Sequence, residues 1–281
     1  MLCVYNAENY IRGCIKALLD QTIKDFEIVI VDDGSTDNTR NIIEDFDDKR
    51  IRYFRNRKNI GVAESRNKCI KLSRGENLFF TDGDCIVSKN WLEQGLKFLK
   101  EKGCVGVEGR THYVAEDYKP TYSDGVIKNE KPGQFMTCNM AYKKSFVERI
   151  GGFDKRYIYN SDRDLALRLT KLGKIHFNPN MIVCHQKHTL KPMEFVQTSK
   201  RIRSRVLLYK KFRERKLILW RIIYPLNLMA ILFPPLIFVS FLRNRYRTKE
   251  DFALFPFIYI RLIHERLSLW DMCVKERVFL I

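Results

Sequence analysis

Short apolar runs alternate with longer, more polar stretches along the first part of the chain. Four of these runs have the length and composition of β-strands: residues 26–31, 51–54, 78–80 and 105–107. Two of the intervening stretches, 37–47 and 62–72, follow turns that can start a helix. Strands that alternate with helices are typical of a parallel sheet. The pattern therefore predicts an α/β fold with a doubly wound, mostly parallel sheet and flanking helices.

The neighbouring segments are less regular. Met1–Val4 supplies only a short first strand, so either this strand is trimmed or the true start of the chain lies upstream. Residues 110–134 are polar and rich in Tyr, Lys, Gly and Pro, and we expect a long loop or a small insertion with a functional role. A helix over 142–150 follows, and Asn160 or Ser161 is expected to cap the next helix.

Two carboxylates, Asp82 and Asp84, follow the third apolar run on either side of a glycine. Strand residues two positions apart point the same way, so both acids can face one spot. Parallel α/β sheets bind ligands at the carboxyl ends of their strands. Oxygen ligands at such a place suit Mg²⁺ or Mn²⁺, which can hold a diphosphate. The alternative is a solvated Asp-Gly turn.

The net charge of +18 is concentrated in the C-terminal third of the chain. Residues 197–281 contain 18 Lys/Arg and 6 Asp/Glu, a balance of +12, whereas residues 1–196 contain 33 and 27, a balance of +6. Because the basic residues of the tail flank a long apolar run, the pattern favours an anionic membrane surface as the partner. Nucleic acid is the competing polyanion, but aromatic residues near the basic cluster are few and no nucleic-acid motif is evident.

The eight cysteines are scattered without a Cys-x-x-Cys pair, and no signal peptide precedes them. This pattern predicts reduced thiols in a cytosolic compartment rather than a disulfide framework. The potential ligands do not have the spacing of a zinc site. The apolar fraction of 45% is sufficient for a sizeable core.

Residues 222–242 contain no charge over a length that could cross the hydrocarbon core. Basic residues flank both ends of this segment, which disagrees with a single span under the positive-inside tendency. A break at Pro234-Pro235 would instead allow the segment to enter and return, although non-helical backbone needs protein cover at that depth. We expect membrane attachment through residues 198–260 with its topology open, and a buried pair of soluble helices is the alternative.

Several short motifs occur in a set order along the chain. They are Tyr5-Asn6-Ala7-Glu8-Asn9, Val31-Asp32-Asp33-Gly34-Ser35, Asn59-x-Gly61-x4-Arg66-Asn67, Thr81-Asp82-Gly83-Asp84, Gly151-Gly152-Phe153-Asp154 and Ser161-Asp162-Arg163-Asp164-Leu165, followed by His185. Over residues 2–188 this series resembles the inverting family 2 glycosyltransferases of the GT-A fold. The resemblance implies a GT-A nucleotide-sugar-binding catalytic domain over 1–192, and it leaves 193–281 as a basic helical region with the apolar membrane segment 222–242.

The resemblance implies displacement of a nucleoside diphosphate from the anomeric carbon of a sugar. A divalent cation, Mg²⁺ or Mn²⁺, neutralises the charge of such a leaving group. Asp84 is implied as the main metal ligand, and His185 is implied to complete the metal shell, with His188 as a nearby rival. Asp82 is implied to contact the ribose, or the metal through water.

Five further residues are assigned to the nucleotide sugar on the same basis: Asn6, Glu8, Asp33, Arg66 and Asn139. Asp33 can accept a hydrogen bond from the imino N–H of a uracil-like base, and turn capping is its alternative role. Arg66 can reach the nucleotide, and an ordinary surface arginine is the alternative. Asn139 is assigned to the donor-sugar pocket.

Asp162 is implied as the general base. An acceptor hydroxyl is a weak nucleophile, so a carboxylate must take its proton as the new bond forms. The start of a helix stabilises this anion, and helix capping is the alternative role of Asp162. Asp164 is expected to be structural. The chain departs from the family pattern at Cys85, where a third acid often follows the aspartate pair, and at Ser161, where Glu is usual.

Together with the basic, apolar tail, the resemblance implies a membrane-associated glycosyltransferase of polysaccharide biosynthesis with a cytoplasmic catalytic domain. Its donor is predicted to be a nucleotide sugar, most directly a UDP-sugar, and its acceptor a lipid-linked or cell-surface glycan. A non-catalytic nucleotide-sugar-binding or scaffold protein of the same fold is the alternative from another class. A nucleotidyltransferase would share the sheet and the acidic metal site, but it would need a glycine-rich, basic phosphate loop near the N-terminus, which the sequence lacks.

Overall fold

A computed structural model of the chain describes residues 1–113, 127–187, 190–212, 218–219, 222–223, 231–233 and 249–278. The chain forms two compact units. The first comprises Met1–Glu116 and Ile127–Gln186, and the second comprises Asp117–Val126 and Lys187–Ile281.

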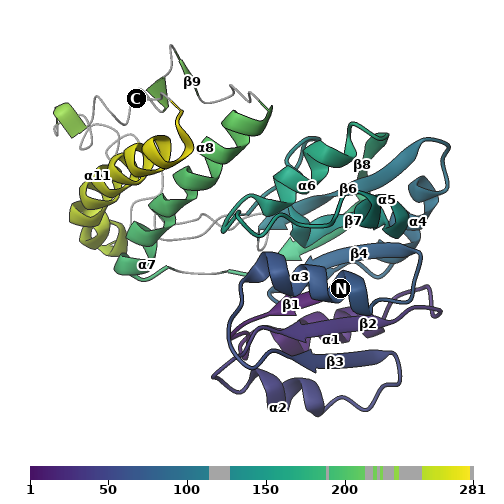
Figure 1. Cartoon of the computed structure of the whole chain (residues 1–281). Helices are drawn as coiled ribbons and strands as arrows, with labels where there is room; N and C mark the ends of the chain where they lie inside the picture. The colour runs from purple at the N-terminus through teal and green to yellow at the C-terminus, as the bar shows by residue number, and fades with distance from the viewer. Residues whose placement is uncertain are drawn as a thin grey trace. The chain divides into compact units, whose positions relative to one another are not determined.

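The first unit is built on an eight-stranded mixed sheet with the strand order β3-β2-β1-β4-β7-β6-β8-β5 (Figure 1). Its strands are β1 (Leu2–Val4), β2 (Ile28–Asp32), β3 (Ile51–Arg55), β4 (Asn77–Asp82), β5 (Cys85–Val87), β6 (Cys104–Tyr113), β7 (Met140–Lys143) and β8 (Lys174–His185). Strands β3, β2, β1 and β4 are parallel, as predicted. The other half is mixed, because β7 is antiparallel to β4 and β6, and β5 is antiparallel to β8.

Helices flank this sheet: α1 (Ile11–Leu19), α2 (Thr39–Glu44), α3 (Val62–Leu72), α4 (Trp91–Leu99), α5 (Lys144–Arg149) and α6 (Ser161–Leu169), with a 3₁₀ turn η1 (Thr137–Asn139). The predicted helix over 62–72 is confirmed as α3, and α2 is shorter than the predicted 37–47. Helix α1 buries Ile11, Cys14, Ile15 and Leu18, whose spacing of three or four places them on one helix face.

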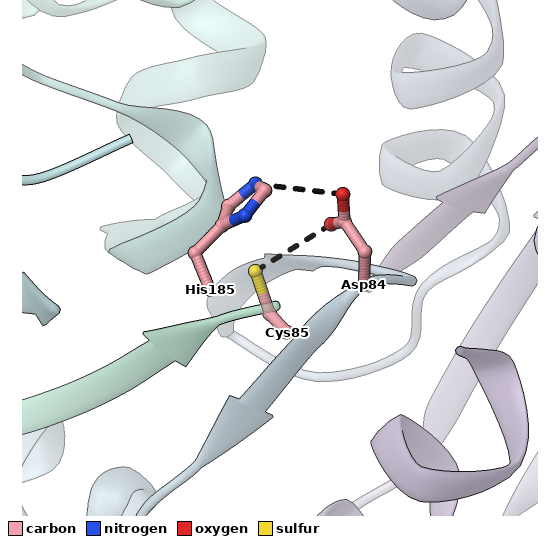
Figure 2. A group of neighbouring side chains, drawn as sticks. All are labelled: Asp84, Cys85 and His185. Carbon is pink, nitrogen blue, oxygen red and sulfur yellow. Dashed lines mark hydrogen bonds and ion pairs between the residues drawn. The ribbon is translucent and has the colours of Figure 1, made fainter. Parts of the chain in front are cut away.

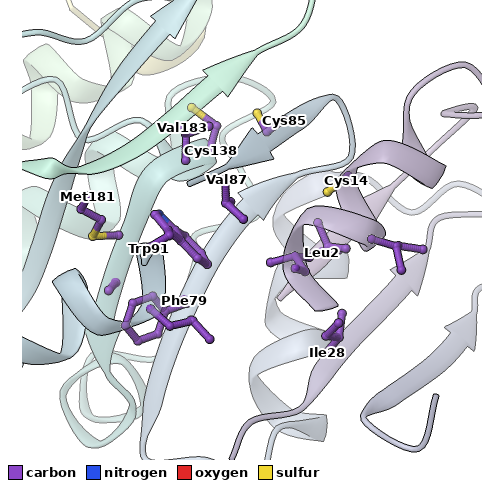
Figure 3. Packing of buried hydrophobic residues seen from close by; sticks show 14 of the residues in the cluster. Leu2, Cys14, Ile28, Phe79, Cys85, Val87, Trp91, Cys138, Met181 and Val183 are labelled. Carbon is purple, nitrogen blue, oxygen red and sulfur yellow. The ribbon is translucent and has the colours of Figure 1, made fainter. Parts of the chain in front are cut away.

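The main core lies between the sheet and helices α1 and α4 (Figure 3). Phe79 of β4 meets Trp91 of α4 edge to face, with ring centroids 5.2 Å apart. Leu2 and Ile28 extend the same cluster to β1 and β2. All eight cysteines are free thiols, and most of them are buried. This packing fixes the strands whose ends carry the polar motifs.

Two expectations about chain course are wrong. The long loop predicted over 110–134 does not begin at Arg110, because β6 continues to Tyr113 by pairing with β8. Residues 114–126 lie outside the described part. The helix predicted over 142–150 begins only at Lys144, because Met140–Lys143 is strand β7, which pairs with both β4 and β6. Periodicity missed β7 because a four-residue strand directly precedes the helix.

The second unit contains α7 (Pro192–Gln197), η2 (Thr198–Lys200), α8 (Arg201–Phe212), a short ladder of β9 (Ile218–Leu219) and β10 (Ile222–Ile223), and α11 (Lys249–Glu276). Helix α11 packs on α8 and on α7 through two small apolar clusters. None of the helices in the described part of this chain combines the length and the hydropathy that a membrane span requires. Most of the predicted apolar segment 222–242 lies outside the described residues.

Candidate active site

The polar motifs lie where the parallel strands end. Strands β1, β2 and β4 run in the same direction, so Val4, Asp32 and Asp82 end at one edge of the sheet. The backbone N–H of Asp33 donates to the carbonyl of Val4 at 2.8 Å, which ties the loop after β2 to the end of β1. Ligands of parallel sheets bind at this edge. The observed topology therefore brings motifs from separate parts of the sequence to one region.

A candidate metal site is formed by Asp84, Cys85 and His185 (Figure 2). Cys85 opens β5 and is the register partner of His185 at the end of β8, so their side chains are cross-strand neighbours. His185 Nε2 lies 3.5 Å from Asp84 Oδ2. One potential ligand atom of each residue lies within 4.8 Å of the other two. Antiparallel pairing of β5 with β8 thus places the predicted ligands Asp84 and His185 side by side.

The hydrogen bonds of His185 define which nitrogen can bind a cation. Its Nδ1 lies 2.9 Å from the carbonyl oxygen of Gln186. A carbonyl only accepts, so Nδ1 carries a proton toward Gln186, and Nε2 is the nitrogen that faces Asp84. A second partner that fixes the tautomer in this way is typical of metal-binding histidines. The Asp84 carboxylate is a ligand type that suits Mn²⁺ or Mg²⁺, and the imidazole of His185 adds a nitrogen ligand beside it.

The electrostatics of Asp84 also favour a cation. Burial raises the pKa of Asp84; His185 opposes this effect, and the neighbouring Asp82 carboxylate adds to it. A positive ion would relieve both burial and repulsion. Cys85 is fully buried, and contact with Cys138 together with burial raises the pKa of its thiol well above the usual value. A thiol is a weak ligand, so Asp84 and His185 are the stronger candidates.

Arg66 and Asp82 form an ion pair at this edge. Arg66 Nη2 donates to Asp82 Oδ1 at 3.1 Å, and the guanidinium lies over the ring of Phe153 at 5.6 Å from its centroid. The residue is only 9% exposed, which excludes the ordinary surface arginine. Burial opposes the charge of Arg66, but nearby acids, Asp82 and then Asp162 among them, raise its pKa above the usual value. Arg66 is therefore a fixed cation between two of the predicted site residues.

Asp33 holds the loop before α3. Its Oδ1 accepts the side-chain N–H of Asn56 and the backbone N–H of Ile60, both at 2.9 Å, and its Oδ2 accepts the backbone N–H of Gly61 at 2.9 Å. A carboxylate has about four acceptor positions. These contacts give Asp33 a turn-holding role, and its contact with a base stays a prediction.

Asn6 and Glu8 connect the N-terminal loop to the loop before α2. Asn6 Oδ1 accepts the backbone N–H of Thr36 at 2.8 Å, and Glu8 Oε2 accepts that of Asn38 at 2.9 Å. Asn6 itself adopts a left-handed φ of 51°. Both side chains thus shape the loops that follow β1 and β2, and their binding to a nucleotide sugar stays a prediction.

Asp162 lies in the first turn of α6 and is partly exposed. Its Oδ2 accepts the backbone N–H of Thr137 at 3.4 Å, which links α6 to η1. Asn160 occupies the N-cap position, as predicted, with a left-handed φ of 59°, but its side chain makes no capping hydrogen bond. Asp164 is fully buried and pairs with Arg168 at 2.7 Å. Asp162 is thus the carboxylate of this turn that remains accessible.

Asn139 is held deep in the core. Its Oδ1 accepts the indole N–H of Trp91 at 2.8 Å, and its Nδ2 donates to the carbonyls of Arg110 and Met181. The residue is 1% exposed. These contacts give Asn139 a structural role, and a contact with the donor sugar stays a prediction. His188, the rival metal ligand, lies outside the described residues.

Two residues without a predicted role organise this region. Glu108 is buried and accepts N–H groups from Asn129 and from the backbone of residues 133–135. Asn67 Nδ2 donates to the carbonyl of Phe153, and its Oδ1 accepts the N–H of Phe153, both at 2.8 Å. The sequence signal for Glu108 was its position as an acid directly after the apolar strand residues 105–107. Asn67 stood beside Arg66 in a motif, but its partner is 86 residues away.

Comparison with known protein families identifies the family of the chain. The model of "Glycosyl transferase family 2" matches residues 1–153. The chain belongs to this family. Membership in glycosyl transferase family 2 favours glycosyl transfer over nucleotidyl transfer, and it agrees with the order of motifs at the sheet edge.

Relatives of this family 2 member include several bacterial proteins. An uncharacterised glycosyltransferase of Haemophilus influenzae is 25% identical over 208 residues, which cover 67% of this chain and 64% of that protein. The putative teichuronic acid biosynthesis glycosyltransferase TuaG of Bacillus subtilis is 38% identical over 118 residues, which cover 41% of this chain and 47% of that protein. The chain therefore spans less than two thirds of the length of these relatives.

Solved structures share the fold. TarS of S. aureus, residues 1–349 in complex with UDP, has a TM-score of 0.57 at 17% identity, covering 99% of this chain and 91% of that chain. The mannosyltransferase PcManGT of Pyrobaculum calidifontis, in complex with GDP-Man and Mn²⁺, has a TM-score of 0.61 at 16% identity, covering 96% and 86%. At this identity the likeness shows a GT-A-like fold.

Proposed function

We propose that this protein transfers a sugar from a nucleotide sugar to a glycan acceptor, with inversion and with a divalent cation. The observation that carries the proposal is the convergence of Asp84 and His185 across β5 and β8, next to Asp82 and Arg66. This arrangement combines a cation site with a fixed guanidinium at the edge where parallel sheets bind phosphorylated ligands. Both are suited to a diphosphate.

The proposed roles of the site residues follow from their charges. Asp84 and His185 would hold a divalent cation, which would neutralise the charge of the diphosphate leaving group. Asp82 is close enough to Arg66 to accept its hydrogen bond at 3.1 Å, so the guanidinium is oriented before a donor arrives. The guanidinium of Arg66 also lies over the ring of Phe153, and this cation–π contact helps to hold it in place. The chain thus presents positive charge where the leaving group develops negative charge.

Asp162 is proposed as the general base. The carboxylate is partly exposed, lies in the first turn of α6, and accepts backbone N–H groups of Arg163 at 2.8 Å and of Thr137 at 3.4 Å. It is near enough to Arg66 to raise the pKa of that residue, so it belongs to the same electrostatic group. A base placed there takes the proton of the acceptor hydroxyl as the hydroxyl attacks the anomeric carbon.

The donor and acceptor are proposed from the relatives. TarS has been solved with UDP and with UDP-GlcNAc, which supports a UDP-sugar, whereas PcManGT was solved with GDP-Man. A UDP-Glc:alpha-D-GlcNAc-diphosphoundecaprenol beta-1,3-glucosyltransferase of Escherichia coli, WfaP, is 28% identical over 178 residues. Its name supports a lipid-linked glycan as acceptor. Such an acceptor, together with the +12 balance of residues 197–281, supports a position at the cytosolic face of a membrane.

Transfer assays with Asp162→Asn test the base. We expect the transfer rate to fall by about 10²–10⁴-fold, while the Kd of UDP with Mn²⁺ measured by calorimetry stays within about threefold, because an uncharged isostere preserves the fold. Retained turnover would remove Asp162 from this role. A wild-type protein that binds UDP-sugars but turns none over, across a panel of donors and acceptors, would favour the non-catalytic alternative suggested by Cys85 and Ser161.

Metal dependence is tested separately with Asp84→Asn. In the wild type, Mn²⁺ should tighten UDP binding, and chelation should abolish this gain. In the variant the gain from Mn²⁺ should be lost, with the metal-independent affinity little changed. Glu93→Gln, an exposed acid on α4, serves as the control and should respond to Mn²⁺ like the wild type.

A further inference from the structure

Helix α11 of the second unit exposes an apolar stripe. Between residues 256 and 274, every well-exposed side chain of this helix is apolar: Pro256, Ile260, Ile263, Leu267, Trp270 and Val274. Exposed fractions range from 36% at Ile263 to 79% at Val274. Spacings of three and four residues place these side chains on one face of the helix.

This stripe is not the face that packs inside the unit. Leu269 and Cys273 cluster with residues of α8, and Ile258 and Leu262 cluster with Phe195 of α7. Figure 1 shows α11 alongside α8. A surface helix in water normally turns charged and polar side chains outward. Helix α11 therefore has a second apolar face in addition to its core face.

Two acids of α11 are paired with bases. Asp271 lies 3.2 Å from Arg203 of α8 and 2.9 Å from Lys275, and Glu276 lies 2.8 Å from Lys210 of α8. These two acids are thus neutralised locally, and helices α8 and α11 together carry nine Lys/Arg against five Asp/Glu. The helix that carries the stripe and the helix packed against it therefore have a net positive charge.

We propose that this stripe is a docking face for an anionic lipid surface, with α11 lying in the plane of the interface; this rests on the membrane-associated glycosyl transfer proposed above. An apolar face within a basic region is the pattern of interfacial helices, and Trp270 is suited to the boundary between headgroups and acyl chains. The stripe from Ile260 to Val274 is about 21 Å long at 1.5 Å per residue. Because Arg261, Glu265 and Arg266 lie within this length of the same helix, the helix lies on the bilayer rather than across it.

A second copy of the chain is the competing occupant, because the spacing also suits a helix pair. Two copies would bring together two regions that each carry a balance of +12, which opposes association. An anionic surface is complementary to that charge. The charge therefore favours lipid over a second copy.

Vesicle co-sedimentation of the full chain tests the proposal. We compare Leu267→Glu/Trp270→Glu with Thr170→Glu/Asn180→Glu, which adds the same charge at exposed positions of the first unit. On phosphatidylglycerol-containing vesicles the stripe variant should bind about 100-fold more weakly than the wild type, roughly tenfold for each side chain withdrawn from the interface. The control should bind within about threefold of the wild type. Equal binding by the two double variants would overturn the proposal.

A second measurement does not depend on how residues 222–242 behave. In a Trp220→Phe background, Trp91 is 1% exposed within the first unit, so Trp270 is the tryptophan that can meet lipid. Brominated phospholipids should quench its fluorescence and shift its emission to shorter wavelength, and Trp270→Phe should remove both effects. An unquenched Trp270 would contradict docking by this face. A dimer in the absence of lipid that dissociates in the stripe variant, with vesicle binding unchanged, would identify a second copy as the occupant.

The two proposals fail in different ways. Transfer to a water-soluble acceptor without vesicles reports on glycosyl transfer alone. Loss of vesicle binding with retained transfer is the expected result for the stripe variant. Vesicle binding without any transfer by the wild type would instead count against the proposed function.

Discussion

Replacement of Gly152 by alanine should be much more costly than the same change at Gly151. Both glycines have left-handed backbones, with φ of +71° and +78°. An alanine at either position costs about 1 kcal/mol for that conformation. At Gly151 the new Cβ meets nothing within 4 Å, whereas at Gly152 it would overlap Asn67 Oδ1. The neighbouring glycine is therefore a matched control with the same backbone strain.

The overlap would disrupt the reciprocal pair of hydrogen bonds between Asn67 and Phe153, both 2.8 Å long. Two such bonds contribute about 2 kcal/mol, which gives about 3 kcal/mol for Gly152→Ala against about 1 kcal/mol for Gly151→Ala. For a chain of this size, 1 kcal/mol corresponds to about 2–4 °C in Tm. Gly152→Ala should therefore melt about 4–8 °C below Gly151→Ala.

The same change should reach the candidate site. Phe153 supports Arg66, and Arg66 pairs with Asp82, so movement of residue 153 should loosen that pair. We expect UDP binding with Mn²⁺ to weaken in Gly152→Ala and to stay near the wild-type value in Gly151→Ala. Thermal unfolding followed by circular dichroism and calorimetric titration provide the two measurements. Melting temperatures within about 1 °C of each other would refute the steric argument.

Two further predictions concern buried and surface carboxylates. Glu108→Gln should lower the free energy of unfolding by about 2 kcal/mol, because an amide cannot accept at both of the positions that hold Asn129 and residues 133–135. Glu148→Gln, at an exposed acid of α5, is the control in thermal unfolding. Equal losses of stability in the two variants would contradict the prediction. Hydrogen bonds from Arg50 lower the pKa of Asp48 to about 2. The pair therefore stabilises the fold at pH values above the ordinary pKa of 3.8, and this stability is lost as the pH falls through about 2. Because the pair is partly exposed, Asp48→Asn should lower the free energy of unfolding by less than about 1 kcal/mol near pH 6. The difference in Tm between this variant and the wild type should shrink toward pH 2. A difference in Tm that stays constant with pH would contradict the prediction.

The parallel half of the sheet was predictable because strands and helices of ordinary length alternate there with clear turn residues. The strand ends then implied where Asp33, Asp82 and Asp84 gather. The antiparallel strands β5 and β7 were not predictable, because three or four residues show no resolvable period and their partners lie far along the chain. For the same reason the facing of Cys85 and His185 needed the structure, although the resemblance had already named His185.

Side-chain partnerships were the hardest features to foresee. The family resemblance suggested roles for Asn139 and Asp33 toward a ligand, yet both make several hydrogen bonds inside the fold. Asn67 and Glu108 gave little sign of their importance, because their partners are distant backbone groups rather than neighbouring motifs. Spacing rules predict which residues of one helix or strand share a face. They do not predict these contacts, because the contacts join separate elements.

The pairing of β5 with β8 has a consequence for the order of folding. Asp84 and His185 are about a hundred residues apart in sequence, and closing a loop of that length delays their contact relative to local pairing. During synthesis the strand that carries Cys85 is complete well before β8 exists, and it forms an edge of the sheet whose described partner is β8. Capture of the proposed cation by both ligands would therefore require the last strand of the sheet to have docked, so Mn²⁺ binding followed during refolding should report when the first unit is complete.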